Sequence, residues 1–100
     1  MSVILHKLHG DDLDDYELEN LDGIEEAWYF YKSGSYEGSG QMLARVGDLW
    51  DIHDMGHCSC YGPLEKFSFN GKTLAQVHAM QSADYAKETA ELFDAVGFAA

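Results

Sequence analysis

Short apolar and aromatic runs, separated by glycine and polar residues, predict β-strands over much of the chain. In one of these runs Trp50 and Ile52 alternate with polar neighbours, which is the pattern of a strand with one buried face. The two residues before that run, Gly47 and Asp48, match a two-residue hairpin turn. The runs lie at residues 2–8, 27–32, 41–46, 49–53 and 66–69. Their close succession in the middle of the chain predicts an antiparallel meander.

The last quarter of the chain has a helical period instead, with many alanines between its apolar positions. Thr73 and Gln76 match a capping box at its start, and Gly97 fits the position just after a helix end. Ser82 can cap a second helix, so a break near Gln81 is the alternative to one long helix. The expected fold is a single α+β domain over residues 1–100. It combines an antiparallel β-meander of three to five strands with one long or broken C-terminal helix packed on one face.

The segment between the first two strands is open to two interpretations. An aspartate at its start, Asp11 or Asp12, can cap a helix, and Gly23 fits the position after a helix end. Acids near its end, such as Asp22, oppose the helix dipole. Residues 11–22 are therefore expected to form either a short helix or an irregular acidic loop.

The charge of the chain is strongly negative and unevenly spread. Eighteen acids against six bases give a net charge of −12. Residues 11–26 hold nine of the acids and no Lys or Arg. This composition excludes a nucleic-acid-binding surface, which needs a basic stripe, but it suits a protein that occupies the nucleic-acid site of a partner. The plainer interpretation is a solvated face.

A helix over residues 11–22 would place four acids along one face, with neighbouring side chains about 6 Å apart. DNA phosphates along one strand have a spacing of that order. The four acids are Asp11, Asp15, Glu19 and Asp22. Further contacts are expected from the rest of the acidic window and from the tip of a glycine-rich turn at residues 33–40. The candidate partner-binding residues are Asp11, Asp12, Asp14, Asp15, Glu19, Asp22, Glu25, Glu26, Tyr36 and Glu37.

The octapeptide at residues 56–63, G-H-C-S-C-Y-G-P, holds both cysteines. On an extended segment Cys58 and Cys60 face the same side and can share a zinc ion with His57 or His53. Their spacing is one residue shorter than the usual ligand pair, and the chain has no second pair. A strained disulfide and a turn with two free thiols are the alternatives. A catalytic thiol would need a base that cannot be assigned, so we expect no enzyme.

Two short motifs together resemble a group of small uncharacterised proteins of phages and prophages. They are Y-E-G-S-G at residues 36–40 and H-C-S-C-Y-G-P at residues 57–63, and the similarity extends over roughly residues 28–64. The resemblance implies a phage or bacterial accessory setting and transfers no catalytic or ligand residue. No apolar run is long enough to span a membrane, so we expect the bacterial cytoplasm.

The expected function is a non-enzymatic inhibitor of a host protein. Its partner would carry a basic nucleic-acid-binding surface, as a defence effector of the CRISPR–Cas kind does, and the acidic window would act as a nucleic-acid mimic. The alternative is a small zinc-stabilised interaction module built on Cys58 and Cys60.

Overall fold

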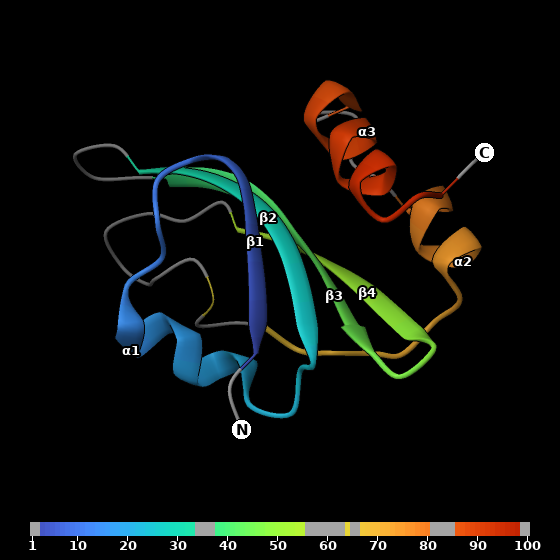
Figure 1. The fold of residues 1–100 in the computed structure, drawn as a ribbon, viewed down its shortest axis with the longest axis horizontal. Coiled ribbons are helices and arrows are strands. Elements are labelled where there is room, and N and C mark those ends of the chain that lie inside the picture. Colours follow the sequence, from blue (N-terminus) through green and yellow to red (C-terminus); the bar gives the residue numbers. More distant parts are fainter. Residues whose placement is uncertain (1–2, 34–37, 56–63, 65–66, 81–85, 99–100) are drawn as a thin grey trace.

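A computed structural model describes residues 3–33, 38–55, 64, 67–80 and 86–98. Its centre is a four-stranded sheet in the order β1-β2-β3-β4 (Figure 1). The strands are β1 (Ile4–Gly10), β2 (Glu26–Ser33), β3 (Gly38–Val46) and β4 (Leu49–Asp54). Each contains most of a strand predicted from the sequence. Gly47 and Asp48 form the predicted turn between β3 and β4, and Gly47 has a positive φ of 60°.

The sheet is mixed, and this corrects the expectation of an antiparallel one. Strands β2, β3 and β4 pair antiparallel, as predicted, but β1 pairs parallel with β2. Two parallel neighbours need a crossover connection, and residues 11–25 provide it with α1 (Asp15–Leu18) and the 3₁₀ helix η1 (Glu19–Leu21). Neither a full helix over residues 11–22 nor a wholly irregular loop is present.

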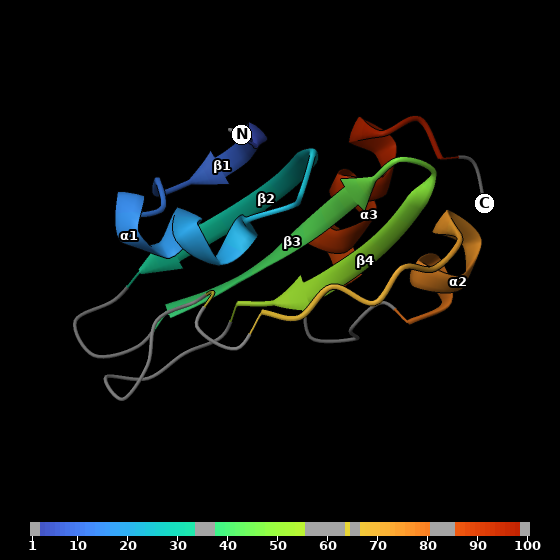
Figure 2. The same ribbon diagram turned by 90° about the horizontal axis from the view of Figure 1, so that it is seen from below.

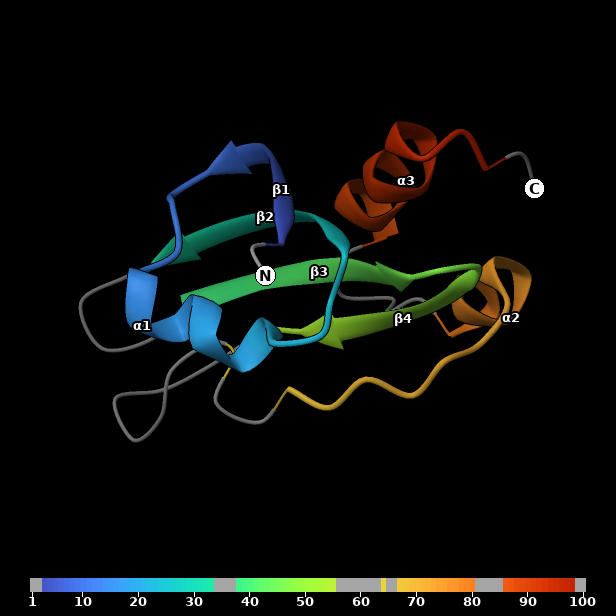
Figure 3. The same cartoon turned by 60° about the horizontal axis from the view of Figure 1, so that its bottom comes forward.

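Both faces of the sheet are covered, because its strands alternate apolar side chains between two cores. In β2, Tyr29 and Tyr31 face the first core, while Phe30 faces the second. The first core lies under α1 and η1, and Figure 3 shows α1 and α3 on opposite sides of the sheet. The first core comprises Leu13, Leu21, Ile24, Ala27, Tyr29, Tyr31, Met42, Ala44, Met55 and Leu64. The second comprises Phe30, Leu43, Val77, Leu92 and Phe93.

The C-terminal segment forms two helices, α2 (Leu74–Ala79) and α3 (Ala86–Ala95), which confirms the broken form of the prediction. Both pack on the second core (Figure 2). The capping box is present, since Gln76 N–H donates to Thr73 Oγ1 at 3.1 Å and Thr73 N–H donates to Gln76 Oε1 at 3.0 Å. Gly97, with a φ of 74°, ends α3 as predicted. The proposed cap at Ser82 lies outside the described residues.

The predicted strand at residues 66–69 is not confirmed. Residues 67–69 have no strand structure, and Lys66 lies outside the described residues. The chain pairs with β4 further along, at Lys72, which exchanges backbone hydrogen bonds of 2.8 and 2.9 Å with Trp50. The buried carboxylate of Asp51 stabilises this arrangement by accepting from Asn70 N–H at 2.8 Å and from Lys72 Nζ at 3.3 Å. Among the described helices, none is long and apolar enough to cross a membrane.

Candidate functional site

The acidic crossover between β1 and β2 is held to the sheet by its apolar side chains. Leu13 and Leu21 are buried in the first core. Asp14 has an extended backbone at the start of α1, and its carbonyl oxygen accepts the N–H of Glu17 at 2.9 Å. Gly23, with a φ of 88°, turns the chain toward β2. Acids near the C-terminal end of so short a helix oppose its dipole, which disfavours extension of the helix beyond this turn.

The predicted row of four acids along one helix face is wrong. Asp11 lies before the helix, where its Oδ2 accepts hydrogen bonds from Ser33 N–H at 2.9 Å and from the Ser33 hydroxyl at 3.2 Å. These contacts, the backbone one first, hold the pKa of Asp11 below its ordinary value. Asp11 is therefore tied to the end of β2 and does not align with Asp15.

Seven of the nine acids in residues 11–26 are exposed, Glu26 is half-buried, and Glu17 is buried. Glu17 was not among the predicted site residues, and its role is internal. Its Oε2 accepts the backbone N–H of Leu64 at 3.0 Å, and Leu64 is itself fully buried. This contact fixes the crossover to the residue that follows the cysteine octapeptide.

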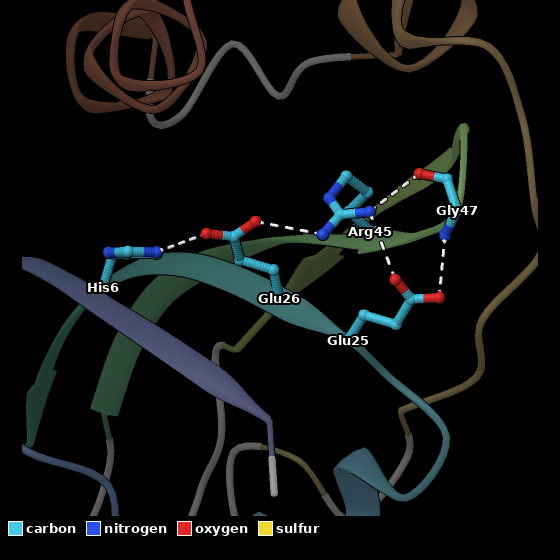
Figure 4. Close-up of polar contacts among 5 residues, drawn as sticks. All are labelled: His6, Glu25, Glu26, Arg45 and Gly47. Carbon is cyan, nitrogen blue, oxygen red and sulfur yellow. Dashed lines mark hydrogen bonds and ion pairs between the residues drawn. The ribbon is translucent and has the colours of Figure 1, made fainter.

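Several exposed acids have cationic partners within the fold. Lys7 Nζ lies 2.8 Å from Asp12 Oδ1, and this contact raises the pKa of the Lys7 ammonium. Arg45 binds both Glu25 and Glu26, at 3.3 and 3.1 Å, as Figure 4 shows. Most of the negative charge at these positions is therefore compensated locally.

The crossover also carries acids without such a partner. Its exposed acids are Asp14, Asp15, Glu19 and Asp22. None of the four forms an ion pair with a Lys, Arg or His that the structure describes. In a chain with a net charge of −12, this segment is a concentrated source of negative potential.

The predicted zinc site is described only at His53. The half-buried imidazole of His53 packs edge-on against Phe67, with 5.3 Å between the ring centroids. The other proposed ligands, Cys58, Cys60 and His57, lie outside the described residues, so the zinc hypothesis stays a prediction. Within the described ranges, no three His, Cys, Asp or Glu side chains are placed to hold a metal ion. The proposed contact residues Tyr36 and Glu37 also lie outside those ranges.

Two histidines on β1 form contacts that the sequence did not indicate. His6 Nε2 lies 2.6 Å from Glu26 Oε2, and its ring stacks on Trp28 with 5.0 Å between centroids. His9 Nε2 lies 3.6 Å from Glu91 Oε2 of α3. His6 and His9 are three residues apart in the chain and still share a face of the sheet, because the register of β1 against β2 shifts between Lys7 and His9.

Comparison with known proteins adds no assignment. No protein-family model, no curated protein and no solved structure matches this chain.

Proposed function

We propose that this protein is a non-enzymatic inhibitor that binds a host protein through its acidic crossover and takes the place of nucleic acid. The host protein would be a nucleic-acid-binding defence effector of the CRISPR–Cas kind. This expectation rests on the acidity of the chain and on its resemblance to small phage and prophage proteins.

One observation carries the proposal: four exposed carboxylates of the crossover lack a described cationic partner, while acids on either side are paired. Partner binding at an already paired acid must first break an internal contact, whereas Asp14, Asp15, Glu19 and Asp22 are free of that cost. We therefore propose that the binding surface is the crossover alone, without Asp11. Glu25 and Glu26 belong to the neighbouring Arg45 network.

The test is capture of host proteins from a bacterial lysate on immobilised protein, at low and at high salt. A mimic of nucleic acid binds mainly by charge, so we expect a captured protein that is released as salt rises. Salt-insensitive capture, or no specific capture, would contradict the proposal.

A matched pair of variants separates the crossover from the net charge of the chain. Asp15→Asn/Glu19→Gln removes two charges from the crossover. The control, Asp48→Asn/Asp94→Asn, removes two charges from exposed positions in the β3–β4 turn and in α3. We expect the first variant to capture the host protein no longer and the second to capture it as before. Equal weakening by both variants would show that capture depends only on the net charge of the chain.

A further inference from the structure

An Asn-Gly pair lies in the segment that joins the sheet to α2. Asn70 and Gly71 are exposed, lie outside the helices and strands, and directly precede the bridge between Lys72 and β4. The main chain of Asn70 is held, because its N–H donates to the buried carboxylate of Asp51 at 2.8 Å. Its carboxamide, by contrast, has no hydrogen-bond partner among the residues that the structure describes. The side chain of Asn70 can therefore turn toward Gly71.

Gly71 is the residue that a reaction with this carboxamide needs. A glycine nitrogen is the least hindered in a chain, because no Cβ stands beside it. The packing also favours glycine here, since a Cβ at Gly71 would lie 2.7 Å from Cδ1 of Leu49. A larger residue would have to displace the Leu49 side chain. The Asn-Gly pair is therefore part of how this segment packs on β4.

The Asn70 carboxamide and the Gly71 nitrogen can form a cyclic imide. The nitrogen loses its proton to hydroxide and attacks Cγ of Asn70. An N–Cγ bond forms, the Cγ–Nδ2 bond breaks, and Nδ2 takes a proton from water and leaves as ammonia. Water then adds to either imide carbonyl and opens the ring, which yields aspartate or isoaspartate, in which the main chain runs through the side-chain carbons. The reaction consumes only water, and no group is oxidised or reduced.

Lys72 is placed to assist the first step of this reaction. When the Gly71 nitrogen loses its proton, resonance puts negative charge on the carbonyl oxygen of Asn70, because both atoms belong to one peptide unit. The ammonium of Lys72 donates to this oxygen at 2.9 Å, and Asp51 Oδ1 accepts from the same ammonium at 3.3 Å. A cationic donor held at the atom where charge develops stabilises the charged state. The contact therefore favours loss of the proton from Gly71.

We propose that Asn70 is a site of spontaneous deamidation, in which Lys72 assists the attack by Gly71, and that the modification releases this segment from β4. Either product adds a carboxylate to a residue whose main chain is bound to the Asp51 carboxylate, and like charges repel. Isoaspartate also lengthens the main chain between two fixed contacts, the hydrogen bond to Asp51 and the bridge to Trp50. Both contacts cannot then keep their geometry. The inference goes beyond the proposed function and does not depend on the acidic crossover.

The chain contains two asparagines, so it provides its own control. Asn20 is followed by the buried Leu21, and its Nδ2 donates to Glu17 O at 3.1 Å. The purified protein is kept at neutral pH and physiological temperature, and samples are digested and analysed by mass spectrometry that distinguishes isoaspartate. We expect amide loss at Asn70 and not at Asn20, with a rate that rises with pH because Gly71 must lose a proton. A synthetic peptide of residues 67–74 gives the rate in the absence of the fold.

Variants of Lys72 test its part in the reaction. Lys72→Gln removes the cation and should slow amide loss at Asn70 by about 3-fold or more, a modest effect beside that of a donor in a closed oxyanion hole. Lys72→Arg keeps a cationic donor and should retain most of the rate. Lys87→Gln, which removes an exposed cation from α3, should leave the rate unchanged. A faster reaction in Lys72→Gln would show that Lys72 protects Asn70 by holding its main chain, and would overturn the assisting role.

Hydrogen exchange at the backbone amides of Trp50 and Lys72 measures release of the segment. The deamidated protein is separated by ion exchange through its additional negative charge, and we expect both amides to exchange faster in it than in the unmodified protein. Asn70→Asp supplies the charge without the longer main chain, so it should lose less protection than the isoaspartate form. Asn70→Gln keeps the contacts of the main chain and cyclises slowly, so it should resist deamidation and stay protected.

Three results would overturn the proposal. If Asn70 kept its amide in the folded protein while the peptide reacted, the fold would block the reaction. Equal amide loss at Asn20 would show that the structure selects no site. Unchanged exchange at Trp50 and Lys72 in the deamidated protein would show that the modification does not release the segment.

Discussion

The buried contact between Glu17 and Leu64 gives the sharpest stability prediction. Glu17 is 4% exposed, and its carboxylate accepts the N–H of a fully buried residue 47 positions away in the chain. Alanine at position 17 removes the acceptor and leaves that N–H without a partner. A hydrogen bond to a charged group contributes about 1.5–3 kcal/mol, and an unsatisfied buried donor costs about 1–3 kcal/mol. We therefore expect Glu17→Ala to lower the free energy of unfolding by about 2–3 kcal/mol.

Urea unfolding followed by tryptophan fluorescence measures this difference. Glu17→Gln keeps a carbonyl oxygen at the same distance and removes a buried charge, so we expect a loss of only about 1 kcal/mol or less. Glu19→Ala is the matched control: it removes an exposed carboxylate two residues away and should change stability by less than about 0.5 kcal/mol. If Glu17→Ala were as stable as Glu19→Ala, the contact would not hold the crossover to Leu64.

Three further predictions concern other parts of the molecule. Thr89→Val removes the hydroxyl that donates to the buried Gln41 carboxamide, and we expect a loss of about 1–3 kcal/mol in the same unfolding assay, with Thr89→Ser retaining more of the stability. The pKa of Asp11 is lowered in the folded state by Ser33, so its stabilising effect is present above the ordinary aspartate pKa and is lost as the pH falls through the lowered value. In Asp11→Asn, the free energy of unfolding should therefore fall less steeply as the pH is lowered through the acidic range. An unchanged pH dependence would show that Asp11 does not stabilise the fold through Ser33. Treatment with a chelator should leave the melting temperature unchanged, whereas stoichiometric zinc by metal analysis together with a lower melting temperature would favour the zinc-stabilised alternative.

Local patterns in the sequence predicted the individual elements well, because those elements depend on neighbouring residues. The alternation of Trp50 and Ile52 with polar positions correctly predicted the strand β4, but not its buried side, since Asp51 is buried while Trp50 and Ile52 are half-buried. The capping box at Thr73 also depends on residues within one turn, and it is present. Such local agreement does not determine which strands pair.

The wrong predictions concern contacts between segments that are far apart in the sequence. The parallel pairing of β1 with β2 depends on a crossover whose helical content is small, so no helical period revealed it. The expected row of acids required a helix that extends back to Asp11. Asp11 instead accepts hydrogen bonds from Ser33, at the end of the neighbouring strand β2. The role of Glu17 could not be predicted, since its partner is far away in the chain.

The stacked rings of His6, Trp28 and Trp50 were missed for a related reason. His6, Trp28 and Trp50 come from three different strands, and only the register of the sheet brings their rings together. Sequence spacing places each of them on a strand but does not align one strand with the next. A useful signal was nevertheless present: both tryptophans of the chain fall in predicted strands next to acids.

We propose that the acidic crossover occupies a nucleic-acid site on a host protein. The most direct measurement is competition: a captured host protein is titrated with duplex DNA while its complex with this protein is monitored by fluorescence anisotropy. We expect mutually exclusive binding, in which DNA displaces this protein from the complex. Displacement of Asp15→Asn/Glu19→Gln should need less DNA than displacement of Asp48→Asn/Asp94→Asn. A stable ternary complex of host protein, DNA and this protein would contradict the claim.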